Sequence, residues 1–315
     1  MEVCLRLFKG RFILEYLFWW YGLLRYFIPG LDTRRRIITE LRQMFRLSIS
    51  EHRSSLDTNQ PRDLIDVYLM EIQKGTNPNF DQEGLEMTCL DLFKAGAETS
   101  STTLLWVVLY LVRYQEVQER CYQEVTRVTG EESPALRHAA SLPYCQAVIC
   151  EVQRLACVAP QTIPHRLTRT VKVADYVVPK DSLAMASLWG FMKDPDVWPE
   201  AEQFNPERFL ETDQSQTGVK FKKQEQFVPF GMGRRICMGE TLARDTLFIF
   251  TTTLIKNLKF ENPNNFPKPD PRNFTDGFTV CDFLLIQNLT NLMVSGDSPS
   301  ISCEYKKEMK AYSTE

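Results

Sequence analysis

The chain has 315 residues, of which 43% are hydrophobic and 24% charged, so it can bury a large core in one domain or two smaller ones. Lys and Arg number 37 against 40 Asp and Glu, which gives a formal net charge of −3. Without an excess of basic residues, nucleic acid is not expected as the main partner.

The cysteines indicate reduced thiols rather than a disulfide framework. The nine cysteines stand at positions 4, 89, 121, 145, 150, 157, 237, 281 and 303. Their number is odd, no C-x-x-C pair occurs, and several lie in apolar segments with a helical pattern. Only three histidines are present, and none has the spacing to cysteine of a structural zinc site.

Near the start, residues 12–28 form an apolar run of 17 residues that is interrupted by Glu15 and Arg25. A spanning helix needs about 20 residues and tolerates charges poorly. A secretory signal would end in small residues, whereas Pro29 and Gly30 follow here. We therefore expect a helix in a globular or membrane-surface setting, with a true anchor as the alternative.

Helical periodicity dominates the chain. One amphipathic helix is predicted over 31–54 and another over 61–74, where Pro61 would occupy the first turn. A helix from about 83 to 113 would be about 45 Å long, which suits the central helix of a large α-rich domain. Further helices are predicted over 115–129, 143–157 and 240–258.

Other segments predict short strands and irregular structure. Residues 168–181 are rich in β-branched residues with proline punctuation, which is typical of short strands. Residues 194–210 are rich in proline and aromatic side chains and predict a meander. From 295 onward the chain is polar and is expected to be mobile. The predicted fold class is therefore mainly α with small β-sheets.

Cys237 lies in a glycine- and arginine-rich loop, FVPFGMGRRICMGE (227–240), just before the predicted helix 240–258. A thiolate at the start of a helix receives backbone N–H groups and the positive end of the helix dipole, which temper its donation to a metal. Glycines let the backbone lie against a planar ligand. A lone cysteine is more often buried and inert, but a single soft thiolate in such a loop suits haem iron.

The surrounding pattern favours the haem interpretation. It reads F-x-x-G-x-R-x-C-x-G, with fixed positions at Phe230, Gly233, Arg235, Cys237 and Gly239. In this loop the chain resembles the cytochrome P450 family. The resemblance implies haem b (iron protoporphyrin IX), with Cys237 as the axial iron ligand. It also implies that Arg235 neutralises a haem carboxylate, that Phe230 shields the sulfur, and that Gly231 and Gly239 line the cofactor.

Glu151 and Arg154 stand three residues apart, on one face of the predicted helix 143–157. A lone E-x-x-R is usually a solvated surface pair. The neighbouring sequence AVICEVQRLACV is apolar, however, so burial is expected, and a buried pair needs further partners. The family resemblance supplies Arg208, in FNPERF, as the third member of a structural network.

The sequence AGAETS (95–100) lies in the middle of the long predicted helix. Gly96 costs such a helix about 1 kcal/mol relative to alanine, and the hydroxyl residues that begin at Thr99 can bond carbonyls one turn back. A tolerated packing glycine beside a polar face is the alternative. The resemblance implies that this stretch crosses the distal haem face. There Ala95 and Gly96 leave room for dioxygen, and Glu98 and Thr99 deliver protons.

The sequence PHR (164–166) contains His165, which resembles the family residue that meets a haem propionate, with help from Arg166. An ordinary hydrogen-bonded side chain is the more common interpretation of a lone histidine.

The resemblance is to the microsomal, family-two type of eukaryotic enzyme and extends from about residue 10 to 280. It covers the later part of such a chain, and the W-x-x-x-R element of the earlier part is not matched. A partial cytochrome P450 domain is therefore expected over 1–280, with residues 1–54 as roof helices that touch the membrane. A divergent, mobile tail is expected over 281–315.

The resemblance implies a haem-thiolate monooxygenase that inserts one atom of O2 into an apolar substrate: a fatty acid, steroid, terpenoid or xenobiotic. No G-x-G-x-x-G occurs, so electrons would come from a separate NADPH-dependent cytochrome reductase, with cytochrome b5 as a second candidate. The cations flanking the Cys237 loop would meet an acidic reductase surface, although a charge run is usually only a solvated face. These cations are Lys220, Lys222, Lys223 and Arg234.

The expected location is the cytoplasmic face of the endoplasmic reticulum membrane. A truncated, inactive homologue that binds haem weakly or not at all is the alternative, because missing segments would expose apolar surface and leave polar groups unpaired. A haem-thiolate isomerase or dehydratase is disfavoured by the acid–alcohol pair Glu98–Thr99.

Overall fold

The computed structural model describes residues 31–213, 218–262 and 293–295. The chain divides into two compact units, the first up to Glu98 and the second from Thr99 onward. Each unit is described by itself. The apolar run 12–28 and most of the segment 281–315 lie outside the described residues.

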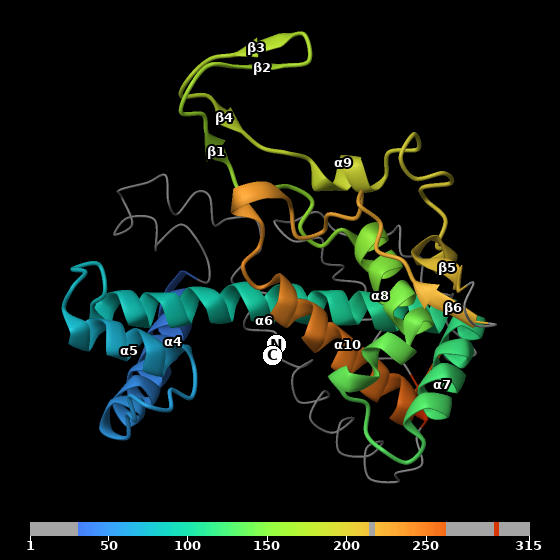
Figure 1. The fold of residues 1–315 in the computed structure, drawn as a ribbon, viewed down its shortest axis with the longest axis horizontal. Coiled ribbons are helices and arrows are strands. Elements are labelled where there is room, and N and C mark those ends of the chain that lie inside the picture. The colour runs from blue at the N-terminus through green and yellow to red at the C-terminus, as the bar shows by residue number, and fades with distance from the viewer. Residues whose placement is uncertain (1–30, 214–217, 263–292, 296–315) are drawn as a thin grey trace. The chain divides into compact units, whose positions relative to one another are not determined.

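Most of the described residues are helical (Figure 1). The longer helices are α4 (Leu31–Ser54), α5 (Leu64–Lys74), α6 (Gln82–Arg113), α7 (Gln115–Thr129), α8 (Pro143–Ala156), α9 (Leu188–Met192) and α10 (Glu240–Asn257). Short 3-10 turns are η1 (Leu136–Ser141), η2 (Pro206–Phe209) and η3 (Gly233–Arg235). The expected class, mainly α with small β-sheets, is confirmed.

The strands form antiparallel pairs. They are β1 (His165–Arg166) with β4 (Leu183–Ala184), β2 (Val171–Val173) with β3 (Tyr176–Val178), β5 (Leu210–Asp213) with β6 (Gly218–Phe221), and β7 (Lys259–Glu261) with β8 (Met293–Ser295). The strands predicted within 168–181 are confirmed as the β2–β3 hairpin, in which Lys172 lies opposite Val177. The other pairs were not predicted, and β8 lies within the segment expected to be a mobile tail.

Most predicted helices agree with the structure to within one residue, but the prediction that one helix begins at Pro61 is wrong. Helix α5 begins at Leu64, and Asp63 is its N-cap. The Asp63 side chain accepts hydrogen bonds from the backbone N–H groups of Ile65 (2.9 Å) and Asp66 (3.2 Å). Because this carboxylate satisfies the first free N–H groups, the helix starts directly after it.

In the first unit, α4 and α5 pack with the beginning of α6 around a small apolar core (Figure 1). Ile49, Leu69, Leu85 and Cys89 are its buried members. Phe45 adds an edge-to-face contact with Phe93, at 5.8 Å between ring centroids. Each of the three helices therefore buries one apolar face, as the periodicity predicted.

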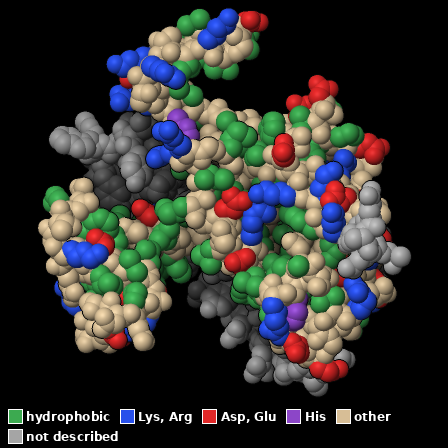
Figure 2. Space-filling model, viewed as in Figure 1, with side chains coloured by type: hydrophobic (Ala, Val, Ile, Leu, Met, Phe, Trp, Pro, Cys, Tyr) green, Lys and Arg blue, Asp and Glu red, His purple; other side chains and the backbone are tan. Residues whose placement is uncertain are grey.

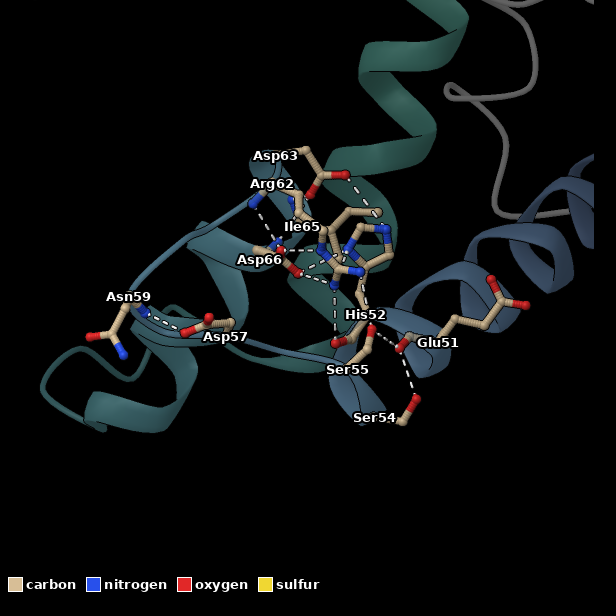
Figure 3. Close-up of polar contacts among 10 residues, drawn as sticks. All are labelled: Glu51, His52, Ser54, Ser55, Asp57, Asn59, Arg62, Asp63, Ile65 and Asp66. Carbon is tan, nitrogen blue, oxygen red and sulfur yellow. Dashed lines mark hydrogen bonds and ion pairs between the residues drawn. The ribbon is translucent and has the colours of Figure 1, made fainter.

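A polar cluster of His52, Arg62, Asp63 and Asp66 joins α4 to the start of α5 (Figure 3). Asp66 is fully buried and accepts from the backbone N–H (3.0 Å), Nε (2.7 Å) and Nη2 (2.9 Å) of Arg62. His52 Nδ1 lies 2.9 Å from Asp66 Oδ1, and its Nε2 lies 3.5 Å from Asp63 Oδ2. The oxygens of Asp66 are thus already bonded, so the cluster is an ion-pair network and is not suited to a metal ion.

In the second unit, the later part of α6 packs with α7, α8 and α10 around a larger core. Trp106, Val148 and Leu247 are buried there on three different helices. Glu124 on α7 caps α8 by accepting from the backbone N–H groups of Tyr144 (3.0 Å) and Cys145 (2.9 Å). This contact replaces the missing side-chain cap of α8, whose own N-cap residue is a leucine.

By length and composition, α6 is the one helix among the described residues that could cross a membrane. Of its apolar window, 56% is buried inside the protein. Packing in the core therefore accounts for its apolar composition, in agreement with the prediction of a central helix.

We expect Asp66→Asn to destabilise the first unit at neutral pH and to reduce its sensitivity to acid. The hydrogen bonds from Arg62, together with the contact with His52, hold the pKa of Asp66 far below its usual range. A carboxylate with a depressed pKa adds stability above its unfolded pKa, which is about 3.9, and that contribution is lost as the pH falls toward the folded pKa. Urea denaturation at pH 7, 5 and 3, followed by hydrogen exchange in peptides of α5, measures the effect.

The control is Asp57→Asn, because within the described residues the Asp57 side chain accepts a single hydrogen bond, from the backbone N–H of Asn59 at 2.8 Å on an exposed turn. Equal pH dependence in the Asp66 and Asp57 variants would contradict the assigned role of Asp66.

Candidate functional site

The loop that carries Cys237 runs from Phe227 to the start of α10 and is shaped by backbone hydrogen bonds. The N–H of Cys237 donates to the carbonyl of Phe230 at 3.0 Å, so the loop folds back on itself. Gly231 (φ +78°) and Gly233 (φ +75°) take left-handed conformations that residues with a Cβ adopt at a cost. Gly239 then serves as the N-cap of α10. Two glycines are therefore required by the turn itself.

Among the described cysteines, Cys237 alone is exposed. The buried free thiols are those of Cys89, Cys121, Cys145, Cys150 and Cys157. Burial raises the pKa of Cys150 and of Cys157 to about 12, which keeps these thiols protonated and unreactive. Of the thiols in the described part of the chain, only that of Cys237 is accessible to a ligand.

The surface around Cys237 is open and apolar. Large apolar side chains beside it are exposed: Met232 (63%), Ile236 (45%), Met238 (87%) and Leu242 (72%). A Cβ built on Gly231 or Gly233 would meet nothing within 4 Å, and one on Gly239 would lie 3.8 Å from the sulfur of Cys237. The loop therefore leaves space for a flat apolar group next to the thiol.

Arg235 lies in η3, is exposed, and has no side-chain hydrogen bond or ion pair within the described residues. On the face drawn in Figure 2, Lys and Arg are interspersed with Asp and Glu and do not form one continuous basic surface. Arg235 is thus available to pair with an anionic group of a ligand.

The structure brings Glu151, Arg154 and Arg208 together. Arg154 donates from Nε to Glu151 Oε2 (2.8 Å) and from Nη2 to Oε1 (2.9 Å), and both side chains are fully buried. Arg208 Nε lies 3.4 Å from Glu151 Oε1, which also accepts from the backbone N–H of Asn205 (3.0 Å). Arg154 further donates to the carbonyl of Met192 at 2.9 Å. These bonds supply the partners that a desolvated ion pair requires.

This network lies close to the core that supports the Cys237 loop. Phe227, at the start of the loop, is buried in one apolar cluster with Ala147 and Cys150 of α8 and with Phe209 of η2. Its ring contacts that of Phe209 edge to face, with 5.0 Å between centroids. Helix α8 therefore carries the buried ion pair and part of the core beneath the loop.

AGAETS (95–100) lies within α6, as predicted. Ala95 and Gly96 are exposed, and a Cβ built on Gly96 would meet nothing within 4 Å. Glu98 is buried, and the carbonyl of Thr99 accepts from the hydroxyl of Thr103 at 2.8 Å. Ala95, Gly96 and Glu98 belong to the first unit, whereas Thr99 and Cys237 belong to the second.

His165 and Arg166 form strand β1, and both side chains are exposed. Arg166 Nη1 pairs with Asp181 Oδ1 at 3.2 Å, in the connection between β3 and β4. The His165 side chain makes no hydrogen bond or ion pair with the described residues.

Sequence reasoning missed Arg244, on α10, which contacts the rings of Phe227 and Phe230. The signal in the sequence was its spacing of four residues from Glu240, which places the two on one helical face. The two phenylalanine contacts could not be predicted, because they depend on how the loop folds back.

Comparison with known proteins agrees with this site. The family model described as "Cytochrome P450" matches residues 2–284. Human cytochrome P450 2J2 is 42% identical over 221 residues, which are 69% of this chain and 43% of that protein. Rat cytochrome P450 2U1 is 37% identical over 276 residues, which are 85% of this chain and 50% of that protein.

A solved structure of a zebra fish cytochrome P450 with progesterone superposes with a TM-score of 0.73 at 32% identity. It covers 85% of this chain and 59% of that one. The chain belongs to the cytochrome P450 family, as the signature loop predicted. It spans about half the length of the curated relatives it matches.

The cofactor of this family is haem b, and the residues of the loop fit it. A cysteine sulfur is a haem iron ligand in the family, and Cys237 offers an accessible one next to an open apolar surface. The uncovered side of Gly231 and Gly233 gives a planar ring system room that a Cβ would reduce. Cys237 would thus hold the iron, and Arg235 could pair with a haem carboxylate.

We expect Arg154→Met to lower the free energy of unfolding of the haem-free chain by about 3–5 kcal/mol, because it leaves the carboxylate of Glu151 buried without its partner. Urea denaturation followed by tryptophan fluorescence measures this loss. The control is Arg137→Met, which removes an exposed ion pair with Glu132 and should cost at most about 1 kcal/mol. Equal losses in the two variants would contradict the structural role of Arg154.

Proposed function

We propose that the chain is a haem-thiolate monooxygenase that inserts one oxygen atom from O2 into an apolar organic substrate. The observation that carries the proposal is the loop of Cys237, an accessible thiol in a turn whose glycines leave open apolar space beside it. Membership of the cytochrome P450 family supports the same reaction class.

The residues of the second unit would bind and orient the cofactor. When bound, haem supplies the activation of O2. Cys237 would hold its iron, while Phe230 and Gly239 would shield and accommodate the sulfur. Arg235, exposed and without a partner in the described part of the chain, would neutralise one carboxylate, and His165 would approach the other.

Proton delivery would fall to Glu98 and Thr99 on α6. Glu98 is buried while Thr99 is half-buried, so the pair extends from the interior of the protein toward its surface. A buried acid next to an alcohol can pass protons without admitting bulk water. Ala95 and Gly96, both exposed and small, would leave room for dioxygen beside them.

Electrons would come from a separate NADPH-dependent cytochrome reductase, with cytochrome b5 as a second donor. Of the cations around the Cys237 loop, Lys220 and Lys222 lie 3.2 and 3.9 Å from Glu211 and are partly neutralised by it. Lys223 and Arg234 are exposed and have no acidic partner among the described residues. These two are therefore the better candidates for contact with an acidic partner surface.

The proposed location is the cytoplasmic face of the endoplasmic reticulum membrane, with the segment before residue 54 at the membrane surface. The proposed substrate is an apolar small molecule such as a fatty acid, steroid, terpenoid or xenobiotic. The zebra fish relative with progesterone is one family member solved with an apolar ligand.

We expect Cys237→Ser to abolish the spectrum of haem-thiolate ligation. The full chain is loaded with haem, reduced and exposed to CO, and the strongly red-shifted Soret band of thiolate ligation is recorded. The serine variant should lack this band because a hydroxyl is a poor substitute for a thiolate ligand. Cys89→Ala, which alters a buried thiol of the first unit, should retain it. No haem uptake by the unaltered chain would favour the inactive alternative.

We expect Thr99→Ala to keep haem uptake and the red-shifted CO band while diverting reducing equivalents from product to hydrogen peroxide. Loss of a positioned proton donor should lower product formation by about 10²-fold. Product and peroxide are measured per NADPH consumed with the reductase present. Thr103→Ala, one turn along the same helix, is the matched control. In this variant NADPH consumption should still lead to product rather than to peroxide. Loss of haem from the Thr99 variant would refute its role in proton delivery.

A further inference from the structure

Arg244 lies in the first part of α10 and contacts both the loop of Cys237 and its own helix. Its Nε and Nη2 each lie 2.8 Å from Glu240 Oε1. Its guanidinium carbon lies 5.3 Å from the ring centroid of Phe230 and 5.8 Å from that of Phe227. Such distances are typical of cation–π contacts. The side chain is 29% exposed, so one guanidinium makes three contacts while remaining largely covered.

Two of these partners are also bonded to Cys237 through the backbone. The N–H of Cys237 donates to the carbonyl of Phe230 (3.0 Å), and the carbonyl of Cys237 accepts from the N–H of Glu240 (3.4 Å). Phe230 lies before Cys237 in the same loop, and Glu240 is the first residue of α10. Arg244 therefore joins the residues that hold Cys237 from its two sides.

Through Phe227, Arg244 also reaches the apolar cluster that includes residues of α8. The thiol of Cys150 is buried, and the nearby Arg244 guanidinium partly opposes the rise in its pKa that burial causes. Phe227 is buried in the same apolar cluster as Cys150 and Ala147. The next residue after Cys150 is Glu151, which belongs to the buried ion pair. Arg244 thus joins the Cys237 loop to the start of α10 and, by way of Phe227, to the cluster packed on α8.

We propose that Arg244 is a positioning residue, which clamps the loop at Phe230 and Glu240 and thereby fixes the Cys237 sulfur where it can serve as a ligand. The clamp itself follows from the contacts of this chain, whereas its effect on ligation rests on the proposed haem-thiolate function. A planar guanidinium can stack on rings and bond a carboxylate at the same time, which the point charge of lysine cannot do equally well.

The test compares Arg244→Met and Arg244→Lys with Arg120→Met. Arg120 is a matched control, since it also has an ion pair, with Glu207, and a cation–π contact, 3.6 Å from the ring centroid of Tyr144. In the haem-free chain, hydrogen exchange of the 230–240 peptide should be about fivefold faster in Arg244→Met, as expected for the loss of one cation–π and ion-pair clamp. It should be unchanged in Arg120→Met and intermediate in Arg244→Lys.

The second measurement is the reduced CO spectrum of the haem-loaded chains. Arg244→Met should shift part of the Soret absorbance from the red-shifted thiolate form to the unshifted form, and Arg244→Lys should partly restore the thiolate form. Arg120→Met should keep the thiolate form throughout. A general loss of stability would affect both methionine variants, so only a difference between them supports the clamp.

Loop exchange in Arg244→Met that equals that of Arg120→Met overturns the proposal. Faster exchange with a fully retained thiolate band also overturns it, because the loop would then be loosened without moving the ligand. If the unaltered chain gives no thiolate band, the proposed function fails, and the exchange measurement still decides whether the clamp exists.

Discussion

The buried ion pair of Glu151 and Arg154 is the interaction on which the second unit depends. Two desolvated charges are stable only when their remaining hydrogen-bonding groups are also satisfied. Here the partners come from distant segments: the carbonyl of Met192, the N–H of Asn205 and the guanidinium of Arg208. The pair therefore links α9 and the segment 205–208 to α8. Without these contacts, α8 would carry a costly charge into an apolar core.

Helix α8, which carries the buried ion pair, also contributes residues to the core that supports the Cys237 loop. The core beneath the Cys237 loop includes Phe227 together with residues of α8, and Arg244 contacts both Phe227 and the start of α10. These contacts connect the helix that carries the ion pair with a loop that also contains backbone hydrogen bonds and two left-handed glycines. A candidate ligand on an exposed loop depends for its position on the residues that support that loop.

The first unit uses the same principle on a smaller scale. Asp66 is a fully buried carboxylate at the start of α5, and donors from Arg62 and His52 satisfy it. This network shows why one helix start was predicted incorrectly. Pro61 is a good first-turn residue in isolation, but the Asp63 cap and the bonds of Asp66 to the residues before it fix the start at Leu64. Side-chain capping overrode propensity at that point.

By itself, the sequence determined the helical periodicity and the chemistry of the signature loop, since both depend on residue type and on spacing along the chain. It therefore predicted α6, α7, α8 and α10 closely, and it identified Cys237 as the ligand candidate. Only the tertiary structure decided which side chains share a charge. Arg166 pairs with Asp181, and Arg244 reaches Phe230, through contacts that arise when hairpins and loops fold back. Spacing along the chain carries no information about such contacts, because they depend on the packing of elements in space.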